Sequence, residues 1–93
     1  MTRRSRLELI HDILLAVQNK GGKIRPTQLM YKSNLSHKLL KNYMAELVEK
    51  ELISVIDVQK KKSTFKEVHL TVQGHEFIAE YRRMQDFTRA FGL

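Results

Sequence analysis

The sequence predicts a small α+β domain that is mostly helical, in which a helix-turn-helix is followed by a β-hairpin and a last helix. Three observations predict this class. Residues 27–50 read as two helices joined by a tight turn, and residues 52–70 contain two β-rich runs around a short basic link. Residues 72–91 repeat apolar side chains at helical spacing. We expect one domain over residues 1–93.

The first helix is expected over residues 5–20. Ser5 and Glu8 can form a capping box at its start, and two consecutive glycines supply the positive φ that ends it. The residues expected in its buried stripe are Leu7, Ile10, Ile13, Leu14 and Val17. Residues 23–25 then form a short extended segment, because Pro26 disfavours helical backbone at the residue before it.

The helix-turn-helix begins with a short helix over residues 27–32, opened by Pro26 and capped by the Thr27 hydroxyl. Residues 33–35 form the turn, and Ser36 caps a second helix that extends to residue 50. The side chains of this second helix that we expect in the core are Leu39, Leu40, Tyr43, Met44 and Leu47.

The opposite face of the second helix carries Lys38, Lys41, Asn42 and Ala45, which are two cations, one amide and one small residue, with no acid. Such a face, turned outward from a helix-turn-helix, is suited to the major groove of DNA. The alternative is a solvated face with ordinary lysines. This stretch alone leaves both interpretations open.

Two strands are expected over residues 52–59 and 65–70, and residues 60–64 join them as the loop of an antiparallel hairpin. Lys60, Lys61 and Lys62 place three like charges at its tip, which does not favour folding. Phosphate contact explains such a tip. A solvated hairpin end that blocks aggregation is the alternative.

The charge of the chain is +7 and unevenly distributed. Residues 1–66 hold 14 basic and 6 acidic side chains, whereas residues 67–93 hold 3 and 4. A basic region of this kind favours a polyanionic partner. Arg3, Arg4 and Arg6 are either an arm that touches DNA or a soluble terminus.

Several classes of protein are disfavoured. The chain has no cysteine, and no apolar run approaches the ~20 residues that span a bilayer. Its four histidines match no close ligand spacing, so we expect no metal and no cofactor. The serines are not placed in a pattern that would activate a nucleophile, and the sequence has no phosphate-binding loop, so we do not expect an enzyme. The basic start lacks a signal-peptide cleavage site, and we expect a cytoplasmic, nucleoid-associated protein with no membrane contact.

The last helix is expected over residues 72–91, capped by Thr71. Its apolar stripe is wider than a small domain can cover, particularly after Met84, so we expect residues 71–93 to form a dimerisation helix. The expected interface residues are Phe77, Tyr81, Met84, Phe87 and Phe91. Packing against the first helix of the same chain is the alternative.

Three segments carry a family resemblance: SRLELIHDILLAV, IRPTQLMYKSNLSHKLLKNYMAELVEKELI and HLTVQGHEFI. With the order helix, strand, helix, helix, hairpin, helix, they resemble the archaeal winged-helix family of small DNA-binding proteins, which includes chromatin-associated and regulator-like members. The resemblance covers roughly residues 5–78. It implies a winged helix-turn-helix with helix 36–50 in the major groove, the hairpin as the wing, and an antiparallel coiled coil of the last helices.

The sequence departs from this family at two places and has a short last helix. Glu51 stands where the family commonly has glycine, so the second helix of the pair is expected to end without a left-handed cap. The wing over residues 54–66 is longer and more basic than usual, which favours wing contacts. The last helix is short for a long coiled coil, so a compact interface is expected.

Two function classes follow. The first is a homodimer that binds double-stranded DNA, as a transcription regulator or an architectural chromatin protein. The second is a winged-helix interaction module whose basic face meets an acidic protein. Lysines on both the helix and the wing favour the first. The side chains expected to contact DNA are Arg25, Lys32, Ser33, Asn34, Ser36, His37, Lys38, Lys41, Asn42, Lys60, Lys61, Lys62 and Ser63.

Overall fold

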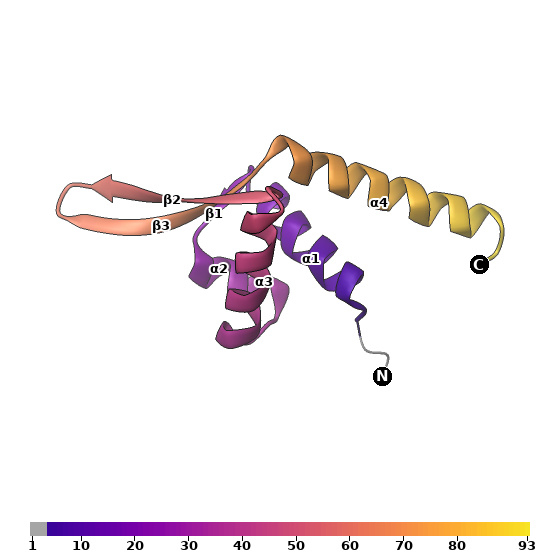
Figure 1. Cartoon of the computed structure of the whole chain (residues 1–93), viewed down its shortest axis with the longest axis horizontal. Coiled ribbons are helices and arrows are strands. Elements are labelled where there is room, and N and C mark those ends of the chain that lie inside the picture. The colour runs from indigo at the N-terminus through magenta and orange to yellow at the C-terminus, as the bar shows by residue number, and fades with distance from the viewer. Residues whose placement is uncertain (1–3) are drawn as a thin grey trace.

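The computed structural model describes residues 4–93 as four helices and three strands (Figure 1). Their bounds are α1 Arg6–Asn19, β1 Lys23–Ile24, α2 Pro26–Ser33, α3 His37–Glu49, β2 Ile53–Lys60, β3 Ser63–Leu70 and α4 Val72–Ala90. The mostly helical α+β class, with the expected order of elements and a C-terminal helix, is confirmed. The hairpin and α4 extend in opposite directions from a body formed by α1, α2 and α3.

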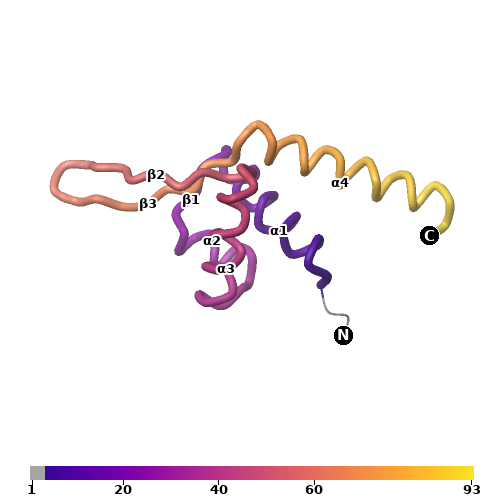
Figure 2. Tube along the Cα trace, viewed as in Figure 1, coloured from indigo at the N-terminus to yellow at the C-terminus, as the bar shows by residue number. Residues whose placement is uncertain are grey.

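The three strands form one antiparallel sheet in the order β1-β3-β2. Strand β1 pairs only with the inner end of β3, where Ile24 faces Val68. The outer part of the β2–β3 hairpin therefore continues as a two-stranded ribbon beyond the body (Figure 2). The register ends at Lys60 opposite Ser63, so the tip is a two-residue turn. Strand β2 is shifted by one residue from the expected range, and β3 begins two residues earlier than expected.

The core lies where α1, α2 and α3 meet the inner ends of the strands. Its buried apolar residues are Ile10, Ile13, Leu14, Ala16, Val17, Ile24, Leu29, Leu40, Leu47, Ile53, Val68 and Ile78. Four expected core residues are not among them. Tyr43 and Met44 are partly buried and pack against the core, whereas Leu7 is 55% exposed and Leu39 is 40% exposed. Leu7 lies in the first turn of α1 and Leu39 in the first turn of α3, where no other element covers the helix.

Helix α2 begins differently from the prediction. Its N-cap is Arg25, which makes no side-chain capping bond, and Pro26 is the first helical residue. The expected Thr27 cap is wrong because Thr27 already lies inside the helix, where its hydroxyl cannot reach the free amides in the capping geometry. The helix also continues through Ser33, and Asn34 ends it in the left-handed conformation with φ 56°.

Helix α3 ends in a left-handed cap, contrary to the prediction. Glu51 has φ 62°, its amide donates to the carbonyl of Val48, and the Leu52 amide donates to that of Leu47. This is the paired bonding of a Schellman motif, which glycine usually forms. The chain therefore needs a left-handed residue at this position to pass from α3 into β2, even though the residue is glutamate.

Helix α4 is attached to the body through its first turn. The Thr71 hydroxyl accepts from the Gly74 amide at 3.0 Å, and its proton is shared between the carbonyl oxygens of Glu51 at 2.7 Å and Leu52 at 2.9 Å. About two turns further on, Tyr81 stacks on His11 of α1 with ring centroids 4.1 Å apart. Burial raises the pKa of Tyr81, and the carboxylates of Glu8 and Asp12 raise it further.

Candidate nucleic-acid interface

The start of α3 presents polar side chains to solvent. The Ser36 hydroxyl accepts from the Leu39 amide at 3.2 Å, which caps the helix as predicted. The exposed residues that follow on α3 are His37, Lys38, Lys41, Asn42 and Ala45. Because Ala45 is small, a groove wall can approach this part of the helix closely, with the amide and the cations on either side.

Two acids of α3 lie beside this face: Glu49 is exposed at the end of the helix, whereas Glu46 is paired within the protein. Glu46 of α3 forms an ion pair with Arg6, which comes from the start of α1. The same guanidinium lies 5.9 Å from the centre of the Tyr43 ring, within the range of a cation–π contact. Sequence reasoning did not assign this role to Arg6, because its partner is 40 residues away in the chain and no local pattern links them.

The turn before α3 contributes fewer exposed side chains to the candidate interface than predicted. Ser33 is only 2% exposed, and its hydroxyl donates to the Leu29 carbonyl at 2.6 Å. We therefore leave Ser33 out of the interface. Asn34 remains exposed, and its left-handed conformation suits asparagine better than most residues.

The hairpin tip is fully cationic. Lys60, Lys61 and Lys62 are all exposed, and Lys61 has φ 55° in the two-residue turn. The Ser63 hydroxyl donates to the Lys60 carbonyl at 3.2 Å, which satisfies one backbone group at the tip. The structure thus presents three ammonium groups at the far end of a narrow ribbon.

Arg25 lies nearer the base of this hairpin, immediately before α2. Its guanidinium is 3.9 Å from the centre of the Phe65 ring on β3. Stacking leaves the N–H groups at the edge of the guanidinium free to donate to an oxygen. Arg25 is thus held against the ribbon between α2 and the wing.

Two other predicted cations lie elsewhere. Lys32 is exposed beside a polar hollow between α1 and α2 that Asp12 and Asn19 also line, apart from the exposed cations of α3. Arg4 donates to Asp12 at 2.8 Å and to the Ser33 carbonyl at 3.1 Å, so it holds α1 and α2 together. Arg3, the remaining part of the suggested arm, lies outside the described residues.

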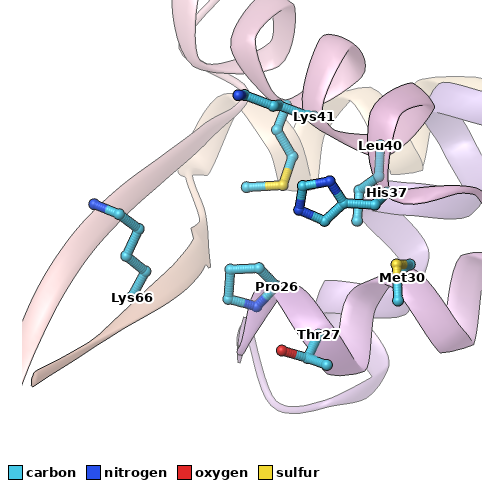
Figure 3. Close-up of a pocket in the computed structure, with 8 residues that line it drawn as sticks. Pro26, Thr27, Met30, His37, Leu40, Lys41 and Lys66 are labelled. Atoms are coloured by element: carbon cyan, nitrogen blue, oxygen red, sulfur yellow. The ribbon is translucent and has the colours of Figure 1, made fainter. Parts of the chain in front are cut away.

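A cavity of about 390 Å³ opens between α2, α3 and β3 (Figure 3). Pro26 and Met30 line it from α2, His37 and Lys41 from α3, and Lys66 from β3. No sequence pattern indicated this cavity. The register that pairs Lys66 with Asp57 follows from the two-residue turn, which was predicted as a longer loop.

Two further observations concern residues 4–93 alone. Nowhere in that range do three histidine or carboxylate side chains gather closely enough to hold a metal ion. No helix there combines the length and the apolar character needed to cross a bilayer.

Residues 3–89 match the model of a protein family described as winged helix-turn-helix. A stretch of 55 residues is 36% identical to an uncharacterized protein of Methanocaldococcus jannaschii, covering 59% of this chain. The matched stretch spans only 25% of the length of that relative.

Solved structures with the same fold include Sso10a-2, a DNA-binding protein from Sulfolobus solfataricus. Its TM-score is 0.74 at 16% identity, covering 95% of this chain and 85% of Sso10a-2. Bordetella bronchiseptica BpsR has a TM-score of 0.72 at 14% identity, covering 88% of this chain and 61% of BpsR. A MarR family transcriptional regulator from Silicibacter pomeroyi has a TM-score of 0.71 at 19% identity, covering 91% of this chain and 53% of that regulator. On its order of elements, its sheet topology and its family match, this chain belongs to the winged helix-turn-helix family.

Proposed function

We propose that this protein binds double-stranded DNA as a homodimer, with α3 in the major groove and the β2–β3 hairpin on the phosphate backbone. The observation that carries the proposal is the exposed face of α3 with two lysines and Asn42, whose neighbouring acid Glu46 is paired with Arg6. The solved relatives with this fold include proteins described as DNA-binding and as a transcriptional regulator, which supports the same function.

The hairpin tip supplies phosphate contacts that do not depend on the DNA sequence. Each lysine that neutralises a phosphate releases counterions, so log affinity falls with log salt by about 0.9 per contact. Three contacts from Lys60, Lys61 and Lys62 would account for a slope of about 2.7. Contacts from α3 add to this slope, and its base contacts supply sequence preference.

Dimerisation is proposed through the outer half of α4. Phe77 and Tyr81, which were expected in the interface, are half-buried within the same chain, so packing on α1 takes up part of the predicted stripe. Met84, Phe87 and Phe91 remain 63–67% exposed, and the two phenylalanine rings lie 4.9 Å apart. A second copy that covers this patch would place two α3 helices on one duplex, with half-sites about 34 Å apart.

A salt-controlled titration tests the DNA contact. The triple variant Lys60→Ala, Lys61→Ala, Lys62→Ala should lower the salt slope by two to three units, roughly one per lost contact. Its melting temperature should be unchanged, because the three lysines are exposed and alanine, like lysine, carries a Cβ at the left-handed position 61.

The matched control removes three arginines from α4, at the opposite end of the molecule in Figure 1: Arg82→Ala, Arg83→Ala and Arg89→Ala. This variant loses the same charge but should keep the slope of the wild type. Equal slopes for the wild type and the lysine variant would remove the wing from the interface. Binding to an acidic protein but to no duplex at low salt would support the interaction-module alternative instead.

A further inference from the structure

We propose that the cavity between α2, α3 and β3 binds a small apolar organic acid, and that the bound acid competes with DNA. The binding is independent of the proposed function, whereas the competition rests on it. The cavity volume of about 390 Å³ lies within the range of ~300–1,000 Å³ typical of small-molecule sites.

The floor of the cavity is apolar. Pro26 and Met30 contribute a ring and a thioether from α2, and Leu40 and Met44 contribute side chains from α3. Leu40 is 3% exposed, whereas Met30 and Met44 are half-buried. Figure 3 shows Met30 and Leu40 among the residues that line the cavity. Methionine side chains adapt to the shape of a ligand, and their sulfur atoms favour contact with aromatic rings.

The remaining wall of the cavity is polar and includes two lysines. His37 and Lys41 lie on the α3 side, and Lys66 lies on the hairpin side (Figure 3). No aspartate or glutamate lines the cavity within the described part of the chain. Lys66 pairs with Asp57 at 3.1 Å, but both side chains are about two-thirds exposed, so this ion pair holds Lys66 weakly. Lys41 and Lys66 border the cavity from two different elements, so each could attract an anionic group at its mouth.

The floor and the rim favour different parts of a ligand. A phosphate would be attracted by the lysines, but it gains nothing from a floor of thioether, proline and leucine groups. An apolar body with one carboxylate matches both the floor and the rim. Because His37 and Lys41 also belong to the proposed DNA face, an occupant of the cavity would engage groups that the duplex requires.

The first experiment measures binding without DNA. The protein carries methyl-¹³C methionine and is titrated with 2-naphthoate, a ligand with two fused rings and one carboxylate. The Met30 and Met44 methyl signals should shift together with a dissociation constant of about 1 mM or tighter, as expected for a ligand of this size. Met84, which lies exposed on α4, is the internal control and should not shift.

Two comparisons test the role of charge. The neutral alcohol 2-naphthalenemethanol should bind at least fivefold more weakly than 2-naphthoate. Lys66→Gln should weaken 2-naphthoate binding at least threefold, whereas Lys62→Gln, at the hairpin tip, should leave it unchanged. Equal binding of acid and alcohol, or no shift at Met30 and Met44, would overturn the site.

The second experiment titrates a duplex at constant ionic strength, with 2-naphthoate or with the same concentration of acetate. Saturating 2-naphthoate should weaken DNA binding at least fivefold relative to acetate. Methionine shifts without any loss of DNA affinity would overturn the competition and leave the site in place. Absence of duplex binding in acetate would instead refute the proposed function, while the methionine shifts would still decide the site.

Discussion

Gly74 gives the sharpest test of how α4 is attached to the body. It is the third residue of α4, where replacing glycine by alanine ordinarily stabilises a helix by about 1 kcal/mol. The structure predicts the opposite sign. A Cβ built on Gly74 would lie 2.3 Å from the Leu52 carbonyl oxygen and 2.4 Å from Cδ1 of Leu70.

The two contacts differ in how easily they can be relieved. The Leu70 side chain can rotate, but the Leu52 carbonyl is fixed by the Thr71 amide at 3.3 Å and the Thr71 hydroxyl at 2.9 Å. Relief therefore requires α4 to move as a unit. Overpacking costs about 1–3 kcal/mol and a weakened N-cap about 1 kcal/mol more. After the helix-propensity gain, Gly74→Ala should lower the free energy of unfolding by about 1–3 kcal/mol.

Thermal and urea unfolding at one fixed protein concentration measure this change. Each 1 kcal/mol corresponds to about 4–8 °C in a domain of this size. Ala79→Gly, at an exposed position of the same helix, isolates the propensity contribution and should cost about 1 kcal/mol. A Gly74→Ala protein as stable as the wild type, or more stable, would refute the close approach of α4 to the start of β2.

Three further outcomes are expected. Glu51→Gly should stabilise the protein by about 0.5–1 kcal/mol in urea unfolding. Glycine removes the steric strain of the left-handed backbone at this position, and this gain exceeds the cost of the greater conformational freedom of the unfolded chain. A loss of stability would contradict the Schellman turn. Asn42→Ala should weaken a selected duplex by about 1–3 kcal/mol and a random duplex hardly at all; equal losses would make Asn42 a positioning residue. Phe87→Asp with Phe91→Asp should give a folded monomer in sedimentation, and an intact protein that sediments as a monomer would refute the dimer.

The fold was predictable because its signals are local. The capping box of Ser5 and Glu8, the Ser36 cap and the Thr71 cap are each formed by residues three apart, and the structure contains all of them. The hairpin followed from two β-rich runs close together. Its tip length was less predictable, because no glycine or asparagine indicates a left-handed turn residue at Lys61.

The misplaced residues were those whose environment depends on distant elements. Periodicity put Leu7 and Leu39 on the core-facing stripes, but it does not tell how far the neighbouring helices extend to cover them. Glu51 was judged by its own preference, whereas the bonds of the following Leu52 and of Thr71 fix its conformation. Ser33 is an exception and was misplaced for a local reason, because its hydroxyl donates to the Leu29 carbonyl in the preceding turn of its own helix.

The cavity was the feature hardest to predict from the sequence, because it depends on the length of the hairpin. Strand β1 pairs with β3 only at His69 and Val68, so β3 leaves the three-stranded part of the sheet before Lys66. From that point the ribbon no longer packs on the core, and a space remains between it and the facing side chains of α2 and α3. Its floor stays apolar because Leu40 and Met44 must also contact the core, while its rim is cationic because Lys41 and Lys66 face outward. A ribbon that protrudes far enough to reach a phosphate backbone thereby also leaves room for an amphipathic acid at its base.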